Sequence, residues 1–154
     1  MIYLSLKTVH LISMVLLFGT GLGSAWYKWM ADRSGDVVHI AVTNRQVVLA
    51  DWLFTTPTIV IQPLTGIAMV LLMEIPLTTP WVMLSLVLYS IAGVCWIPVV
   101  WLQIQMRKLS EVARLTNSEL SEQYWRYAKR WFWLGIPAFI SMILIVVLMV
   151  FKFG

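Results

Sequence analysis

Hydrophobic residues form four long blocks along the 154-residue chain, and more polar stretches separate them. The blocks cover residues 3–26, 47–73, 81–105 and 131–151. Each block is long enough to cross the hydrocarbon core of a bilayer as an α-helix, which takes roughly 20 residues. The pattern therefore predicts an all-α polytopic membrane protein with one integral membrane domain, residues 1–154, folded as an antiparallel bundle of four transmembrane helices.

The polar stretches predict that the second to fourth helices extend beyond the membrane on the cytoplasmic side. Asp36 follows a Ser-Gly turn and is typical of an N-cap, so the second helix should begin near Val37, well before its hydrophobic block. The third helix should continue to about Leu115. The capping-box pattern Thr116–Glu119 then predicts the start of the fourth helix.

Two features qualify the helix pattern. Pro57 and Pro63 lie inside the second block, where neighbouring groups can satisfy the freed carbonyls, so we expect a kinked helix. The first block has an alternative interpretation as a signal peptide, because Gly23-Ser24-Ala25 resembles a cleavage site. No clean basic segment precedes this block, which favours the transmembrane interpretation.

Composition supports the membrane class. Hydrophobic residues make up 60% of the chain and charged residues 12%, whereas soluble domains have about 45–50% and about 25%. The net charge is +4, but the basic residues are not interleaved with a polar binding surface. We therefore expect the lipid bilayer as a partner and no nucleic acid. The sequence contains no phosphate-binding glycine loop and no CxxC or HExxH metal motif, so soluble-enzyme chemistry is not indicated.

Basic residues predict the orientation of the bundle. With four crossings, the two longer connections and the adjoining helix ends lie on one side, and they hold nine of the eleven Lys and Arg residues. These nine are Lys28, Arg33, Arg45, Arg107, Lys108, Arg114, Arg126, Lys129 and Arg130. The positive-inside rule places this side in the cytoplasm and both termini in the periplasm.

Lys7 and His10 are unusual polar residues at the start of the first hydrophobic block. Their spacing places both on one helix face, and Met14 continues this face at i+4 from His10. Lys7 can extend to the outer headgroups. His10 is too short to do so, so it should face the bundle interior, either in a structural hydrogen bond or as a haem or metal ligand. His39 lies outside the membrane and should be a surface residue.

Other polar or small residues inside the blocks suggest contacts between helices. Gln62 precedes Pro63 and is expected to hydrogen-bond across helices or to contact a ligand. Asp51 and Arg107 lie at similar depths and are predicted to form a structural ion pair. Gly19, Gly21 and Gly23 form a small-residue stripe with one GxxxG pattern, which is typical of close packing, including packing against another protomer or a flat ligand.

Several segments carry a family resemblance. They are LKTVHLISMVLLFGTGLGSAW, RSGD, VLADWLFTTPTIVIQPLTG and LYSIAGVCWIPVVWLQIQMR. These segments resemble the bacterial integral-membrane family catalogued as domain of unknown function 2269, over nearly the whole chain. The resemblance implies a four-helix protein of the bacterial inner membrane and no established activity.

The K-x-x-H pattern of Lys7 and His10, followed by glycines, is also similar over the first helix to HemJ-type protoporphyrinogen oxidases and CopD copper-resistance domains. In HemJ-type proteins the first-helix histidine is associated with haem, which implies a haem role for His10. Those proteins also use a lysine in a later membrane helix, whereas this chain has none between Lys28 and Lys108.

Two function classes follow. The first is a haem-associated redox or haem-handling protein with haem b as cofactor, His10 as the metal ligand, and Lys7, Met14 and Gln62 around the site. The second is a non-enzymatic membrane subunit, assembly partner or transport component, as a homo-oligomer or within a larger complex. The sequence leaves open whether the protein is an enzyme.

Overall fold

The computed structural model of the protein describes residues 1–152, and all regular structure in this range is helical. The elements are α1 (Ile2–Ser34), α2 (Val37–Ala50), the π-helix η1 (Asp51–Thr55), α3 (Thr56–Leu72), α4 (Pro80–Leu115) and α5 (Glu122–Phe151). Because α2, η1 and α3 are continuous, the described residues contain four helices long and apolar enough to cross a membrane. The predicted all-α, four-helix membrane fold is confirmed.

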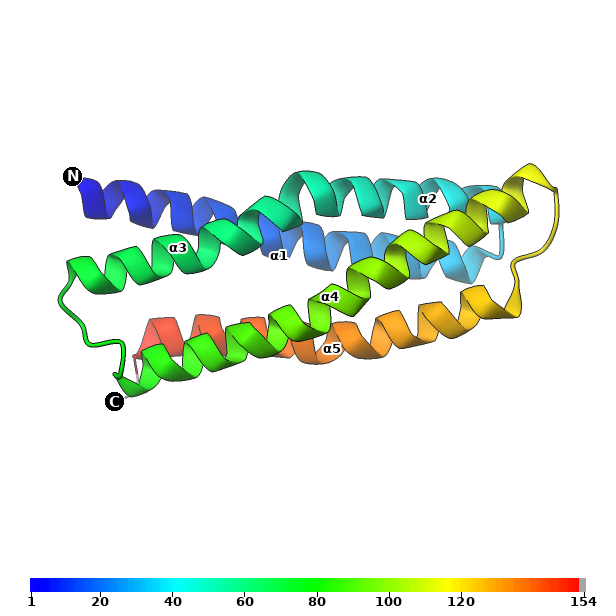
Figure 1. The fold of residues 1–154 in the computed structure, drawn as a ribbon. Helices are drawn as coiled ribbons and strands as arrows, with labels where there is room; N and C mark the ends of the chain where they lie inside the picture. The colour runs from blue at the N-terminus through cyan, green and yellow to red at the C-terminus, as the bar shows by residue number, and fades with distance from the viewer. Residues whose placement is uncertain (153–154) are drawn as a thin grey trace.

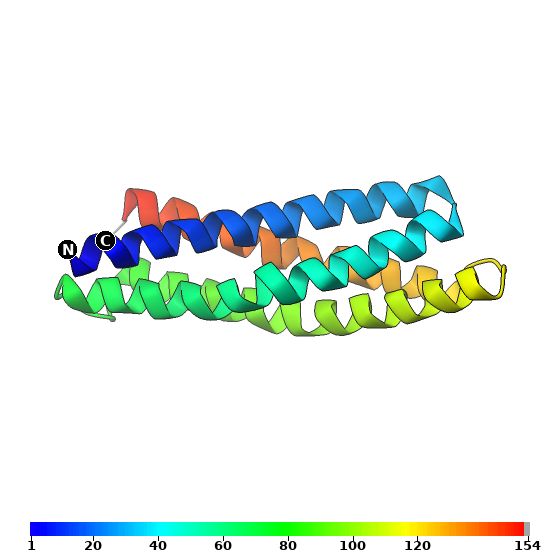
Figure 2. The same cartoon turned by 90° about the horizontal axis from the view of Figure 1, so that it is seen from above.

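The helices run up and down one long bundle, and both termini lie at the same end (Figures 1 and 2). We call this the terminal end, which also holds the turn between α3 and α4; the opposite, loop end holds the α1–α2 and α4–α5 connections. The 36 residues of α4 span about 54 Å at a rise of ~1.5 Å per residue. A bilayer core is only about 30 Å thick, so the helix extends well beyond it, as predicted.

Local sequence signals set most helix boundaries. The Asp36 side chain accepts a hydrogen bond from the Val38 backbone N–H, which confirms the predicted N-cap of α2. The predicted capping box at Thr116–Glu119 is wrong. Asn117 adopts the left-handed conformation and closes the C-terminus of α4, with the Ser118 N–H bonded to the Ala113 carbonyl.

The N-cap of α5 is Ser121, whose side chain accepts a hydrogen bond from the Tyr124 N–H. The two helices are therefore joined by six residues, 116–121, and the fourth helix begins later than the sequence pattern indicated.

Prolines explain the irregular middle of the second membrane helix. Pro57 has no N–H and cannot continue a regular α-helix, and the π-helix η1 lies immediately before this turn, where the chain changes direction (Figure 1). Pro63 lies inside α3 and leaves the Ile59 carbonyl without its usual helical donor. The Tyr89 hydroxyl of α4 donates to this carbonyl. A side chain from a neighbouring helix thus compensates for the proline.

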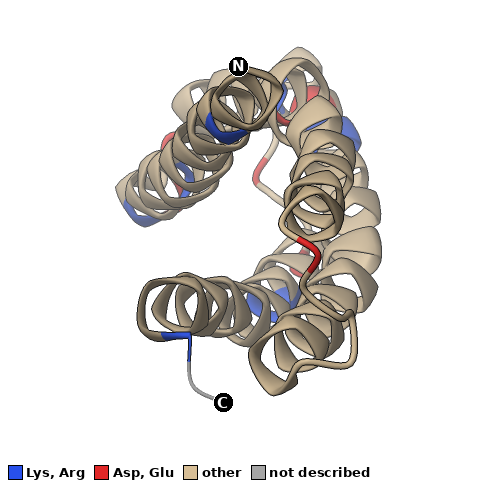
Figure 3. Ribbon diagram, turned by 90° about the vertical axis from the view of Figure 1, so that its left-hand side faces the viewer, with Lys and Arg blue, Asp and Glu red and all other residues tan. Residues whose placement is uncertain are grey.

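The tightest core lies toward the loop end. It contains Ala31, Ile40, Val99, Leu102, Met106, Tyr124 and Trp131. There α1, α2, α4 and α5 converge, and α4 packs most extensively against α5. Viewed from the terminal end, the helices form an arc that is open between α1 and α5 (Figure 3). These two helices are not packed against each other along their lengths.

Candidate functional site

His10 is buried between α1 and α3 in the terminal half of the bundle, with 7% of its surface exposed. Its Nδ1 lies 2.8 Å from the Thr65 hydroxyl oxygen. The Thr65 hydroxyl donates to the Ile61 carbonyl at 2.7 Å, an i–4 contact within α3. Gly66 supplies the space for the ring, because a Cβ at this position would lie 3.4 Å from His10 Cε1.

The hydrogen bonds of Thr65 favour one tautomer of His10. A threonine hydroxyl has one proton, and the Ile61 carbonyl lies 2.7 Å from the Thr65 hydroxyl oxygen. Donation of that proton to Ile61 leaves Thr65 as the acceptor for His10 Nδ1–H, so the lone pair of the neutral ring is then on Nε2. A histidine held in this way can act as a metal ligand through Nε2.

A cavity of about 80 Å³ adjoins His10. Its walls come from α1, α3, α4 and α5 and are mostly apolar. The predicted residues Met14 and Gln62 both line it, together with two further methionines, Met142 and Met149 of α5. The structure therefore brings together an imidazole nitrogen and thioether sulfurs that are distant in the sequence.

Gln62 supports His10 through the backbone of α1. Its side-chain amide donates to the His10 carbonyl at 2.9 Å and to the Ser13 hydroxyl at 2.7 Å. The expected interhelical hydrogen bond of Gln62 is thus formed. Lys7 has an exposed side chain and is not among the residues that line the cavity.

The expected ion pair between Asp51 and Arg107 is not formed. Asp51 is buried and accepts a hydrogen bond from the Thr55 hydroxyl at 2.8 Å, and the buried Gln103 side chain lies near it at the wall of one cavity. Arg107 is exposed. The register of α4 explains the difference, because Gln103 lies one turn before Arg107, about 6 Å along the helix, and occupies the position beside Asp51.

The glycine stripe also differs from expectation. A Cβ added to Gly19, Gly21 or Gly23 would meet no atom within 4 Å outside its own helix. No helix of the described chain therefore packs closely on these glycines. Gly21 instead borders a second, larger cavity between α1, α4 and α5.

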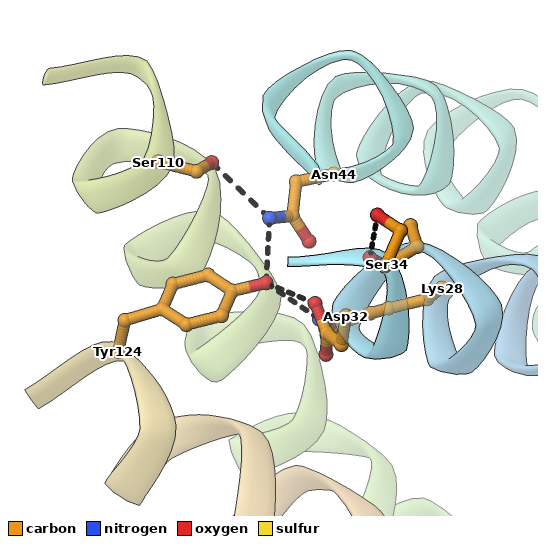
Figure 4. Close-up of polar contacts among 7 residues, drawn as sticks. Lys28, Asp32, Ser34, Asn44, Ser110 and Tyr124 are labelled. Carbon is orange, nitrogen blue, oxygen red and sulfur yellow. Dashed lines mark hydrogen bonds and ion pairs between the residues drawn. The ribbon is translucent and has the colours of Figure 1, made fainter. Parts of the chain in front are cut away.

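A polar cluster at the loop end was missed by the sequence reasoning. Lys28 Nζ donates to Asp32 Oδ2 at 2.8 Å and to the Tyr124 hydroxyl oxygen at 3.0 Å (Figure 4). The Tyr124 hydroxyl donates to Asp32 Oδ1 at 2.5 Å. Asn44 Nδ2 donates to the Tyr124 hydroxyl oxygen at 3.0 Å and to Ser110 Oγ at 3.1 Å. Four helices, α1, α2, α4 and α5, meet in this cluster.

The donors and acceptors of the cluster are well matched. The single proton of the Tyr124 hydroxyl is donated, and the oxygen accepts twice, so its full hydrogen-bonding capacity is used. Lys28 also lies over the rings of Tyr124 and Trp131, at 5.1 and 5.4 Å from their centroids. The i,i+4 spacing of Lys28 and Asp32 in the sequence could have predicted this ion pair. We assign the cluster a structural role.

No group of three or more His, Cys, Asp or Glu side chains that could hold a metal ion occurs among the residues that the structure describes. Among the side chains that line the His10 cavity, His10 is the one residue of these types. The other donor atoms there belong to methionine thioethers, the Gln62 amide and the hydroxyls of Ser85 and Tyr89.

Comparison with known proteins identifies a family but no characterised relative. The family described as "Predicted integral membrane protein (DUF2269)" matches residues 4–153. No curated protein and no solved structure matches the chain.

Proposed function

The chain belongs to the family of predicted integral membrane proteins DUF2269, and we propose that it is a haem-associated redox or haem-handling protein. The observation that carries the proposal is the His10 imidazole: Thr65 holds its Nδ1, and His10 lines one apolar cavity together with three methionines. An intramembrane ionisable side chain is expensive to bury and usually has a functional role.

The side chains around His10 have separate roles in this proposal. His10 would hold the haem iron through its imidazole, and Met14, Met142 or Met149 would be available as a further ligand, a His and Met donor set that suits haem iron. Thr65 and Gln62 position the ring and its backbone. Exposed Lys7, one turn nearer the terminus, is available to a propionate at the headgroup level. When bound, a haem supplies one-electron chemistry at its iron.

The donor set fits a haem iron, but the enclosed space does not hold a whole macrocycle. The cavity of about 80 Å³ is smaller than ordinary ligand pockets, which measure roughly 300–1,000 Å³. The proposal therefore requires the ring to extend into the opening between α1 and α5, or these helices to separate further at the terminal end.

We also propose that the chain lies in a bacterial inner membrane with both termini in the periplasm. The nine basic residues of the loop-end helix segments support this orientation, because cytoplasmic segments are enriched in Lys and Arg. The His10 site would then lie in the periplasmic half of the membrane.

An absorption spectrum tests the haem proposal directly. Protein purified from cells grown with ample haem should show a Soret band, and His10→Ala should abolish or strongly weaken it while remaining monodisperse. His39→Ala is the matched control, because His39 is the other histidine and is exposed. Absence of the band from wild-type protein, with no band on adding haem in vitro, would rule out the proposal.

One observation favours a second candidate, a non-enzymatic subunit of a homo-oligomer or larger membrane complex. The small-residue face at Gly19 and Gly23 is not covered by any helix of the described chain, and such faces pack well against other transmembrane helices. If no haem binds, His10 has only its hydrogen-bonding role, and this second function becomes the leading one.

A further inference from the structure

A second cavity lies deeper in the bundle, between α1, α4 and α5, with η1 at one wall. Its volume of about 360 Å³ is within the range of small-molecule pockets. It adjoins the His10 cavity, since Phe18, Tyr89 and Met142 line both. His10 and Gln62, which carry the haem proposal, do not line this second cavity.

Asp51 gives the cavity one acidic group. Its side chain lines the cavity, is 6% exposed, and has only neutral partners, Thr55 and Gln103. The ion pairs of residues 1–152 join Lys28 to Asp32 and Arg114 to Glu111, so no basic side chain pairs with Asp51. Ionisable side chains inside a membrane protein usually face the interior or a cavity and mark functional sites, and Asp51 does so without a basic partner in the described chain.

The local backbone also singles out this position. Asp51 is the first residue of the π-helix η1, and the Thr56 N–H bonds back to the Asp51 carbonyl, five residues earlier. The α-helical pattern resumes after Thr55. Single π-helical turns inside α-helices occur frequently at functional sites, where the extra residue reorients side chains.

The other walls suit a hydrophobic and partly aromatic molecule. Aromatic rings from three helices line the cavity, including Phe18, Trp96, Trp131 and Phe139. Phe18 and Phe139 meet edge to face, with ring centroids 5.9 Å apart. Aromatic faces attract cations, most strongly where water is excluded.

Small residues leave the central space open. Gly93 of α4 and Gly135 of α5 both line the cavity, and a Cβ at either position would meet no atom within 4 Å. The cavity is lined from both α1 and α5, and the Phe18 and Phe139 rings of these two helices meet beside it.

We propose that this cavity binds a hydrophobic organic cation, an amine or quaternary onium carrying apolar or aromatic groups, with Asp51 as its counter-ion. The Asp51 carboxylate has no basic partner in the described chain, so it can pair with the positive charge of the ligand. The aromatic rings and the space left by the small residues accommodate the ligand's apolar groups. The competing occupant is a neutral lipid chain, which would fill the same space without using Asp51.

Calorimetric titration of the purified full-length protein with tetraphenylphosphonium tests the proposal. Wild-type protein should bind saturably, and Asp51→Asn, which keeps the shape and removes the charge, should weaken binding at least tenfold. Triphenylphosphine oxide, a neutral aromatic probe, should bind far more weakly than the cation. His10→Ala should bind the cation as wild type does, so this result is independent of the haem proposal.

Two outcomes would overturn the inference. Equal affinity of wild type and Asp51→Asn for the cation would show that the carboxylate is not its counter-ion. Equal binding of the neutral probe would identify a purely apolar site, as for a lipid chain. Gly93→Leu keeps Asp51 and fills the cavity, so it should also lose cation binding; wild-type affinity in a folded Gly93→Leu protein would place the cation elsewhere.

Discussion

At the residue scale, single hydroxyl groups organise the polar interior of this protein. Thr65 links the His10 ring to the backbone of α3, and Tyr124 joins the charged pair Lys28–Asp32 to Asn44. In both places one hydroxyl oxygen bonds to several groups at once. Removing such a group leaves several buried partners unsatisfied at once, which costs more than the loss of an exposed hydrogen bond.

Thr65→Val tests the positioning of His10. Valine keeps the size of the side chain but cannot accept the Nδ1 hydrogen, so the ring loses the contact that orients Nε2. Loss of such an indirect partner typically lowers metal affinity about 10–100-fold. In a haem titration followed at the Soret band, Thr65→Val should therefore bind more weakly than wild type but better than His10→Ala. Unchanged affinity would contradict the positioning role.

Tyr124→Phe tests the loop-end cluster. The variant removes the hydroxyl that accepts from Lys28 and Asn44 and donates to Asp32, so we expect a loss of about 2 kcal/mol of unfolding free energy. Tyr127→Phe is the control, because the Tyr127 hydroxyl accepts only from exposed Gln123. Unfolding in detergent should separate the two variants; equal stabilities would exclude a structural role for the cluster.

At the element scale, prolines shape the helix formed by α2, η1 and α3. The π-helix lies before Pro57, and Pro63 leaves a carbonyl that the neighbouring helix satisfies. Both prolines are evident in the sequence, and they predicted an irregular helix. The identity of the donor, Tyr89, required knowledge of which helix face is adjacent.

A double-mutant cycle tests this compensation. Tyr89→Phe should destabilise the protein by about 1 kcal/mol, because the half-buried Ile59 carbonyl loses its donor. Combined with Pro63→Ala, the same change should cost clearly less, since the substituted alanine restores a backbone N–H that can bond to the Ile59 carbonyl. The free energies come from thermal or denaturant unfolding of the four proteins. Additive effects would mean that Tyr89 and Pro63 are not coupled.

At the scale of the whole molecule, the bundle is packed unevenly. The loop end holds the tight core and the charged cluster, whereas the His10 cavity lies in the terminal half. The second cavity lies between them and is bordered by two residues of the core, Val99 and Trp131. The two proposed ligand sites therefore follow one another along the bundle from the terminal end to the core.

Cysteine labelling tests the orientation of the bundle. In a Cys95→Ser background, Thr78→Cys reports on the terminal end and Ser118→Cys on the loop end, and both positions are exposed. A membrane-impermeant maleimide added to intact spheroplasts should react with Thr78→Cys only, and lysis should expose Ser118→Cys. The reverse pattern would overturn the proposed topology.

Local signals in the sequence made three features predictable. They are the four crossings, the Asp36 cap and the position of both termini at one end. Hydropathy over about 20 residues decides whether a segment crosses a membrane, and a cap depends on one short stretch of chain. The site was partly predictable for the same reason. His10, Met14 and Gln62 are conspicuous at their depths, and they do line one cavity.

The partners of the polar groups depended on the tertiary structure. Asp51 meets Gln103 and not Arg107 because one helical turn of register between η1 and α4 separates those alternatives. The glycine stripe borders a cavity and not a helix because α1 and α5 lie apart. Helix rotation, register and spacing arise from the packing of all four crossings together, and no single segment of sequence encodes them.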